Sequence, residues 1–120
     1  MEEILNLIKF NTKKINENCF EIETDVNFKD FSLSLLLKKD GEDFYLSDNK
    51  SIIKFMNDVY ILTSQDVKKC INSILVLYQA TLKKGEILKK VENIKNINEE
   101  ITNFIMMAGS LAFMFVFFEE

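Results

Sequence analysis

The sequence lacks most of the side chains on which enzymes commonly rely. It has no histidine, so neither a serine–histidine–aspartate nor a cysteine–histidine site can form, and the commonest zinc ligand is missing. Its three glycines, Gly41, Gly85 and Gly109, match no phosphate-binding loop. All fifteen basic residues are lysine, so the bidentate recognition of phosphate by arginine is absent. We therefore expect no catalytic activity and no cofactor.

Carboxylates and lysines remain, and a metal-dependent nuclease can be built from these two residue types. Such a site needs an acid on one strand and an acid–x–lysine sequence on the next. The nearest candidate here is Glu86 with Lys89, whose spacing places the two side chains on opposite faces of a strand. A carboxylate-based nuclease or hydrolase with a divalent ion is therefore kept as the alternative to a binding function.

Acidic residues alternate with apolar ones at Glu21, Glu23 and Asp25, so they would project from one face of a strand about 7 Å apart. We favour solvation of an outer sheet face as their role, with a partner-binding surface and a metal site as alternatives. Residues 17–48 hold nine acids and three lysines, which leaves the rest of the chain positive. This excess would repel nucleic acid and favour a basic groove on a protein. The candidate partner-binding residues of this region are Glu21, Glu23, Asp25, Asp40, Glu42 and Asp43.

The segment from Ile101 to Phe118 carries no charge and is rich in phenylalanine and methionine. As a helix it would span about 27 Å, just short of the roughly 30 Å of a bilayer core, and acidic residues flank it. We favour a central helix that is buried on several sides. The alternatives are a helix covered by a homodimer partner or target protein, and a membrane-associated segment. The candidate contact residues are Met106, Phe113 and Phe117.

The hydrophobic pattern predicts the strands that would position these residues. Strict alternation predicts strands from Phe20 to Val26 and from Phe31 to Leu37. The Asp40-Gly41 pair predicts a hairpin turn into a third strand at residues 44–46. A fourth strand is predicted near residues 86–92, with a helix over residues 86–95 as the alternative, because Ile87, Val91 and Ile94 also fit helical spacing.

The helices follow from periodicity and capping signals. Short helices are predicted over residues 1–10 and, after Ser47 and Asp48, up to about Tyr60. Thr63 and Asp66 form a weak capping box before a longer helix that is predicted to reach Leu82 and to end at Gly85 in the C′ position. A last helix is predicted from about Ile97. Together these elements predict one α+β domain over residues 1–120. It is an antiparallel β-meander of three strands plus a fourth, packed against N-terminal, central and C-terminal helices.

Two cysteines and the first residues indicate the compartment. Cys19 and Cys70 match no metal-binding spacing, and we expect unpaired, mostly buried thiols, with a disulfide as the alternative. The chain opens with Met1-Glu2-Glu3, whereas a secretory signal opens with basic residues. We therefore expect a cytoplasmic protein.

Four short motifs occur in a characteristic order: Leu46-Ser47-Asp48, Tyr78-Gln79-Ala80, Gly85-Glu86-Ile87 and the apolar stretch from Ile101. Over residues 17–116 this order resembles the bacterial and phage-associated domain of unknown function numbered 1828. The sequence departs from that pattern after Asp48, where the family tends to have glycine. The resemblance implies a meander-and-helix fold and a mobile-element setting, and it brings no activity or catalytic residues.

These observations predict a non-catalytic protein-binding module of a bacterium, a phage or a related mobile element. A more specific form is an inhibitor of a host nucleic-acid-handling enzyme, such as an anti-CRISPR protein, that occupies a basic groove without binding nucleic acid itself. We expect a protein partner, and a homodimer through the C-terminal helix stays open.

Overall fold

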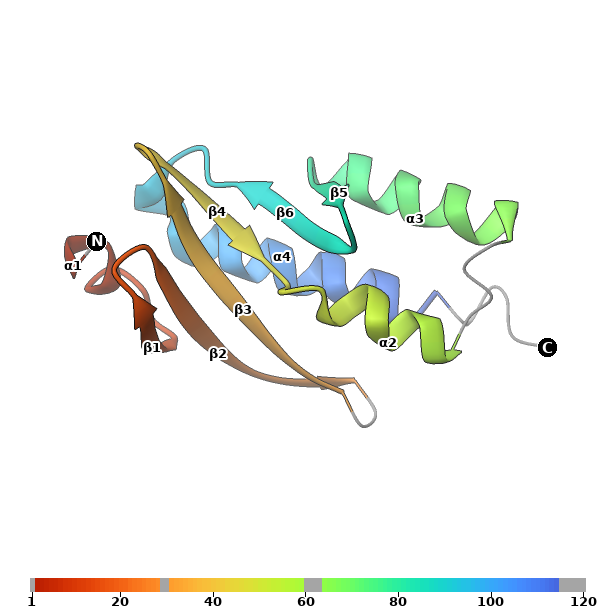
Figure 1. The fold of residues 1–120 in the computed structure, drawn as a ribbon, viewed down its shortest axis with the longest axis horizontal. Coiled ribbons are helices and arrows are strands. Elements are labelled where there is room, and N and C mark those ends of the chain that lie inside the picture. The colour runs from red at the N-terminus through yellow and green to blue at the C-terminus, as the bar shows by residue number, and fades with distance from the viewer. Residues whose placement is uncertain (1, 29–30, 60–63, 115–120) are drawn as a thin grey trace.

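The computed structural model describes residues 2–28, 31–59 and 64–114, and six strands in it form one antiparallel sheet (Figure 1). The strand order is β1-β2-β3-β4-β6-β5. The elements in chain order are α1 (Glu2–Leu5), β1 (Asn11–Asn16), β2 (Cys19–Phe28), β3 (Phe31–Asp40), β4 (Asp43–Ser47), α2 (Ser51–Val59), α3 (Gln65–Leu77), β5 (Thr81–Lys83), β6 (Glu86–Lys90), the 3₁₀ turn η1 (Ile94–Asn96) and α4 (Ile97–Ala112). The predicted α+β class is confirmed.

The predicted meander is present as β2, β3 and β4. Alternate residues of β2 and β3 are buried, as the hydrophobic pattern requires, among them Ile22, Leu35 and Leu37. Gly41 has a φ of 64°, which confirms the predicted turn at the Asp40-Gly41 pair. The predicted fourth strand is β6, which pairs with β4.

Two edge strands were not predicted. All six residues of β1 are exposed, so the strand has no apolar alternation by which a sequence could reveal it. The three residues of β5 fall where the sequence predicted the end of a helix. These strands form the two edges of the sheet, β1 beside β2 and β5 beside β6.

The prediction that the longer helix reaches Leu82 and ends at Gly85 is wrong. The helix α3 ends at Leu77 because the next turn forms a Schellman motif. The Ala80 N–H donates to the Leu75 carbonyl at 2.9 Å, and the Gln79 N–H donates to the Val76 carbonyl at 3.1 Å. Gln79 takes the left-handed C′ position, with a φ of 58°, that glycine usually fills.

Gly85 belongs instead to the tight turn between β5 and β6. Lys83 pairs with Glu86 across a two-residue loop, and the loop residues Lys84 and Gly85 have φ values of 52° and 82°. Two positive φ values are the signature of a type I′ hairpin turn. The Ser64 side chain at the start of α3 makes no capping hydrogen bond, and Thr63 of the predicted capping box lies outside the described residues.

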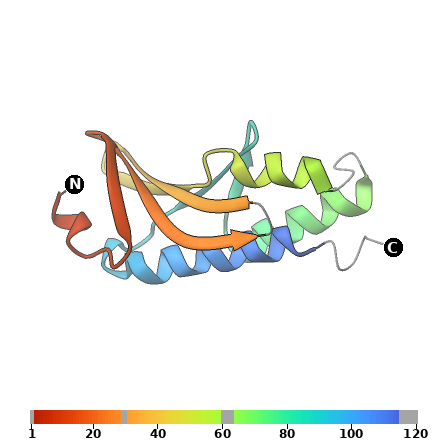
Figure 2. The ribbon, with the colours of Figure 1, turned by 90° about the horizontal axis from the view of Figure 1, so that it is seen from below.

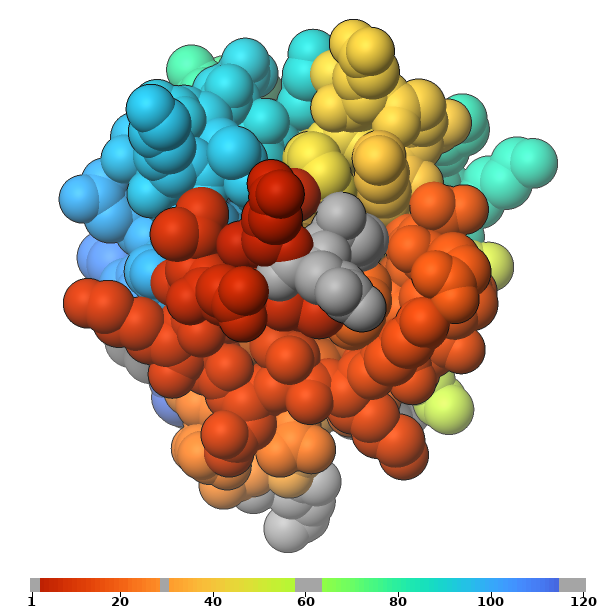
Figure 3. Space-filling view, turned by 90° about the vertical axis from the view of Figure 1, so that its left-hand side faces the viewer, coloured from red at the N-terminus to blue at the C-terminus, as the bar shows by residue number. Residues whose placement is uncertain are grey.

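The N-terminal helix is shorter than predicted, because α1 covers only Glu2–Leu5. The chain then crosses the end of the molecule between the first residues of α4 and the β3–β4 turn (Figure 3). Asn98 of α4 holds residues 7–9 against the helix. Its side chain accepts a hydrogen bond from the Lys9 N–H and donates one to the Leu7 carbonyl, both at 2.8 Å.

The core lies between the sheet and α4, which runs along one sheet face, while α2 and α3 lie toward one end of the molecule (Figure 2). Seven α4 residues are buried: Ile97, Ile101, Phe104, Met107, Ala108, Leu111 and Ala112. One face of α4 therefore lies in the core, as the favoured prediction requires, but the opposite face is exposed, so the expected burial on several sides is not observed. Cys19 and Cys70 are free and half-buried, and burial raises the pKa of the Cys19 thiol.

Candidate functional sites

The predicted row of acids on β2 is interrupted by a bulge. Glu23 pairs with Ser34 and Val26 pairs with Leu33, so two residues of β2 are extra to the ladder. One of them, Asp25, has a φ of 57°. Glu21 and Glu23 keep their alternate positions, but the bulge turns Asp25 out of the row. The expectation of three evenly spaced carboxylates on one face is therefore wrong.

Thr24 fixes the geometry of this bulge. Its hydroxyl donates to the Leu33 carbonyl at 2.6 Å and accepts from the Val26 N–H at 3.2 Å, and its side chain is buried. The Thr24 hydroxyl thus replaces part of the ladder that the bulge breaks. Aspartate tolerates the left-handed region better than most residues, which suits Asp25 to its position.

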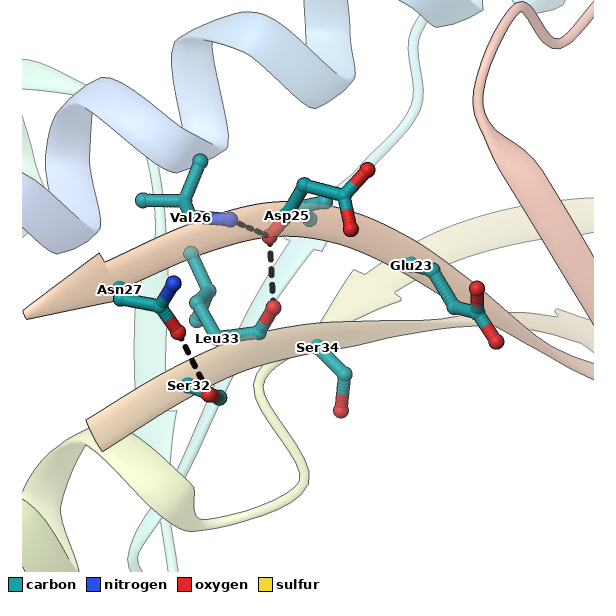
Figure 4. A pocket seen from close by; sticks show the side chains of 8 residues that line it. Glu23, Asp25, Val26, Asn27, Ser32, Leu33 and Ser34 are labelled. Carbon is teal, nitrogen blue, oxygen red and sulfur yellow. Dashed lines mark hydrogen bonds between the residues drawn. The ribbon is translucent and has the colours of Figure 1, made fainter. Parts of the chain in front are cut away.

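The bulge borders an open depression of about 440 Å³. Its polar lining comes from both strands: Glu23, Asp25 and Asn27 from β2, and Ser32 and Ser34 from β3 (Figure 4). The Ser32 hydroxyl donates to the Asn27 side-chain oxygen at 2.6 Å. The sequence predicted the two acids as surface residues, but the polar residues around them become neighbours only through strand pairing, which no local pattern reveals.

The remaining predicted acids lie elsewhere. Asp40, Glu42 and Asp43 are exposed at the β3–β4 turn, six residues along β3 from the partner of Glu23, or about 20 Å in an extended strand. Asp43 lies 3.7 Å from the ammonium of Lys90. The structure thus separates the predicted acidic residues into a bulge group and a turn group.

Lysines offset the acidic charge of the sheet. Lys13 of β1 pairs with Glu21, and Lys38 of β3 pairs with Cys19, between the two acidic groups. The edge strands and β6 add five lysines and one acid to the sheet: Lys13, Lys14, Lys83, Lys89, Lys90 and Glu86. The sheet is therefore less acidic than residues 17–48 alone, because the other strands contribute mostly lysines to it.

The described part of the chain offers no metal-binding cluster of the kind that the nuclease alternative needs. Within it, no group of three or more His, Cys, Asp or Glu side chains is arranged to hold a metal ion. Glu86 accepts a hydrogen bond from Lys38 on one face of the sheet, whereas Lys89 is buried beside Glu100 on the other. The prediction that Glu86 and Lys89 point to opposite faces is confirmed.

A polar junction joins the end of β4, the start of α2 and the start of β6. The buried Asp48 carboxylate accepts hydrogen bonds from three backbone N–H groups: Ile87 at 2.8 Å, and Lys50 and Ile52 at 3.0 Å each. It is thus both a helix cap and a bridge between distant segments. Burial raises the pKa of Asp48, an effect that these N–H donors partly offset.

Ser47 and Glu86 complete the junction. The Ser47 hydroxyl donates to the Glu86 carboxylate, which also accepts from the Lys38 ammonium at 2.6 Å. Burial opposes ionisation of Glu86, yet the hydrogen bonds from Lys38 and Ser47 and the charges of Lys38 and Lys50 outweigh it and lower its pKa. All these groups are satisfied within the fold, so the junction is a structural centre.

The outward side of α4 carries two of the three predicted apolar contact residues. Met106 is 55% exposed and Phe113 is 47% exposed. The Phe113 ring also contacts Phe28 of β2 edge-on, with ring centroids 5.4 Å apart. Phe117 lies outside the described residues. No helix in the described part of the chain is long and apolar enough to cross a membrane.

A second pair of exposed apolar residues lies at the end of α3, which packs against α4. Val76 is 75% exposed and Leu77 is 76% exposed. The apolar residues whose helical spacing predicts this helix do not include Val76 or Leu77, and both are exposed in the structure. The residues with helical spacing are Val67, Cys70, Ile71, Ile74, Leu75, Tyr78 and Leu82. The exposure of Val76 and Leu77 could therefore be predicted from the sequence, because they lie outside the apolar face of the helix.

Comparison of the chain with protein-family models, with curated proteins and with solved structures finds no match.

Proposed function

We propose that this chain is a non-catalytic protein-binding module whose contact surface is formed by the adjoining helices α3 and α4. The supporting observation is that Val76, Leu77, Met106 and Phe113 are each at least 47% exposed on these two helices. We call these four residues the helical surface.

Apolar exposure of this kind favours a covered surface. Single exposed apolar residues are ordinary, but several large ones on helices that pack together carry a hydration cost that a partner would remove. Methionine and phenylalanine are also enriched at protein interfaces. We propose a partner protein of the host cell as the covering molecule.

The test is affinity capture of the tagged chain from its host, read by mass spectrometry, with matched variants. The double variants Val76→Ser/Leu77→Ser and Met106→Ser/Phe113→Ser should each lose a protein that the unmodified chain retains. Ile15→Ser is the control, because Ile15 is 51% exposed but lies on the distant edge strand β1. Capture that is unchanged in both double variants would exclude the helical surface. Capture of the chain's own untagged copy would replace the foreign partner with a homodimer.

The acidic residues support a second candidate, an inhibitor that occupies the basic groove of a nucleic-acid-handling enzyme, as an anti-CRISPR protein would. The observation in its favour is that Glu23, Asp25, Asp40, Glu42 and Asp43 are all exposed. Changing Glu23 and Asp25 to lysine should abolish capture of such an enzyme and remove the salt dependence of binding. Binding that survives both the substitutions and high salt would reject it.

We also propose that the chain is related to the domain of unknown function numbered 1828. The support is that two of the motifs, Leu46-Ser47-Asp48 and Gly85-Glu86-Ile87, meet in the polar junction. Asn49 and Lys50, which stand where that family tends to have glycine, have φ values of 54° and 67°, the region that glycine favours. Homologues collected by sequence should carry glycine at these positions if the relation holds.

A further inference from the structure

A cavity of about 370 Å³ opens where the end of α3 meets β6 and α4. Its lining residues are Leu77, Tyr78, Gln79, Lys89, Glu100 and Asn103. We call it the Lys89 pocket. Known small-molecule pockets begin at about 300 Å³. They are mostly apolar, whereas Leu77 and Tyr78 supply the apolar part of this pocket and the other four lining residues are polar or charged.

The buried ammonium of Lys89 has donors left over. Its side chain is 9% exposed, and its Nζ lies 3.6 Å from Glu100 Oε1, beyond hydrogen-bond length. Within the described residues, Nζ donates one hydrogen bond, to the Lys90 carbonyl at 3.4 Å. An ammonium has three N–H donors, and unfilled donors are costly when buried. An acceptor placed in the pocket would stabilise this group.

Side chains with acceptor and amide groups line the same pocket. Glu100 Oε2 accepts from the Glu92 N–H at 3.2 Å, while Oε1 accepts no hydrogen bond from the described residues. The side chains of Tyr78, Gln79 and Asn103 also make no hydrogen bonds within the described part of the chain. The pocket therefore offers a donor and an acceptor side by side, with further amides around them.

We infer that the Lys89 pocket binds a small molecule through a carboxamide or lactam edge, that is, a carbonyl oxygen next to an N–H group. The carbonyl accepts from Lys89 Nζ, and the neighbouring N–H donates to Glu100 Oε1. Leu77 and the Tyr78 ring contact the carbon part of the ligand. Free glutamine and the guanine base both carry such an edge.

The charges select this chemistry. A plain carboxylate would be attracted by Lys89 but repelled by Glu100, and a plain cation would meet the reverse, whereas a neutral amide edge satisfies both partners. This inference concerns a small-molecule pocket that shares Leu77 with the helical surface, but it does not rest on the protein-binding function proposed there.

The test is a titration of the isotope-labelled full chain, followed by the backbone amide signals of β6 and α4. Glutamine is compared with glutamate, which replaces the amide nitrogen with oxygen, and guanosine with 1-methylguanosine, which blocks the N–H next to the carbonyl. We expect glutamine or guanosine to bind with a Kd of about 1 mM or below, and about tenfold more tightly than its analogue. The two comparisons show whether glutamine or the guanine base supplies the carbonyl and N–H groups that the pocket binds.

Variants locate the site. Lys89→Met should weaken binding about tenfold or more, whereas Lys90→Met, on the opposite face of β6, should leave it unchanged. Lys89→Met leaves Glu100 without its ion-pair partner and could therefore destabilise the fold. The double variant Gln79→Gly/Asn103→Ala keeps this ion pair and should also weaken binding. Both of its positions are exposed, and glycine suits the φ of position 79. Absence of signal changes with all four compounds at about 10 mM would overturn the inference. Equal binding of the analogues, or binding that is unaffected in the variants, would do the same.

Discussion

Asp48 shows how one carboxylate can connect segments that are far apart in the sequence. Its two oxygens accept N–H donors from the start of α2 and from Ile87, which lies 39 residues away. The sequence predicted its role as a helix cap from its place before an apolar run. The bond to Ile87 could not be predicted, because it depends on the pairing of β4 with β6.

Asp48→Ala should destabilise the fold by about 3 kcal/mol, because it leaves buried N–H groups of two elements without an acceptor. Asp48→Asn keeps one acceptor oxygen and should cost about half as much. Urea denaturation of the three proteins measures the difference. Ser51→Ala, at the first residue of α2, is the control and should cost less than either substitution; equal costs for all three would refute this role of Asp48.

The junction also predicts opposite pH trends for two neighbouring carboxylates. The pKa of Glu86 is lowered in the fold, so its stabilisation is present above its unfolded pKa and is lost as the pH falls through the folded pKa. Glu86→Gln should therefore cost about 1 kcal/mol near neutral pH and almost nothing at low pH.

For Asp48, whose pKa is raised, the folded state is favoured by protonation. The unmodified chain should lose this contribution as the pH rises from the ordinary pKa through the raised one. The deficit of Asp48→Asn should then shrink with rising pH, while that of Glu86→Gln grows. Denaturation curves between about pH 3 and pH 7 test both signs, and parallel curves would contradict them.

At the scale of elements, hydrophobic periodicity predicted which strands and helices exist. It did not predict the helix end or the strand bulge, which depend on the backbone conformation of single residues. Helix α4 was predicted from an uncharged apolar segment, whereas strands β2 and β3 and helix α3 bury residues at regular spacing, and their existence followed from that spacing. The end of α3 did not, because Gln79 adopts a backbone conformation for which glycine is the usual signal. The bulge at Thr24 and Asp25 escaped for the same reason, since its sequence reads as regular alternation.

The β5–β6 turn offers a stabilising substitution. Lys84 occupies the first central position of a type I′ turn, which asparagine followed by glycine fills best. Lys84→Asn should raise the free energy of unfolding by about 0.5 to 1 kcal/mol, because asparagine tolerates positive φ at a lower cost. Lys83→Asn, just outside the loop, should bring no gain. A loss of stability in Lys84→Asn would show that the turn has another geometry.

Helix α4 has one face in the core and one in solvent, and the two should respond differently to truncation. Phe104 is fully buried, so Phe104→Ala should cost about 3 to 5 kcal/mol through lost burial and a cavity. Thr102 lies on the exposed side, and Thr102→Ala should change stability by less than about 0.5 kcal/mol. Thermal or chemical denaturation distinguishes them, and similar losses would mean that α4 is covered on both sides.

For the molecule as a whole, counting charge along the chain gave a misleading picture of its surface. Residues 17–48 are strongly acidic, but strand pairing places Lys13 opposite Glu21 and Lys38 between the acidic groups. Strand pairing similarly assembled the depression beside the bulge from two strands. The candidate surfaces could thus be predicted only in part. Exposed apolar residues could be inferred because they lie outside the apolar faces of the helices, whereas residues that are neighbours across paired strands could be identified only from the structure.

The long connection between β4 and β6 determines the order in which this chain can fold. The three hairpins β1–β2, β2–β3 and β3–β4 close short loops, whereas the contact of Asp48 with Ile87 closes one of 39 residues. Closing a long loop costs more entropy, so the hairpins should form before the rate-limiting step and the junction after it. Asp48→Ala should then accelerate unfolding and leave the folding rate nearly unchanged, while Leu35→Ala in the meander should slow folding. Stopped-flow measurements across a denaturant series would show this difference, and the Asp48 carboxylate would then lengthen the lifetime of the folded state without changing its rate of formation.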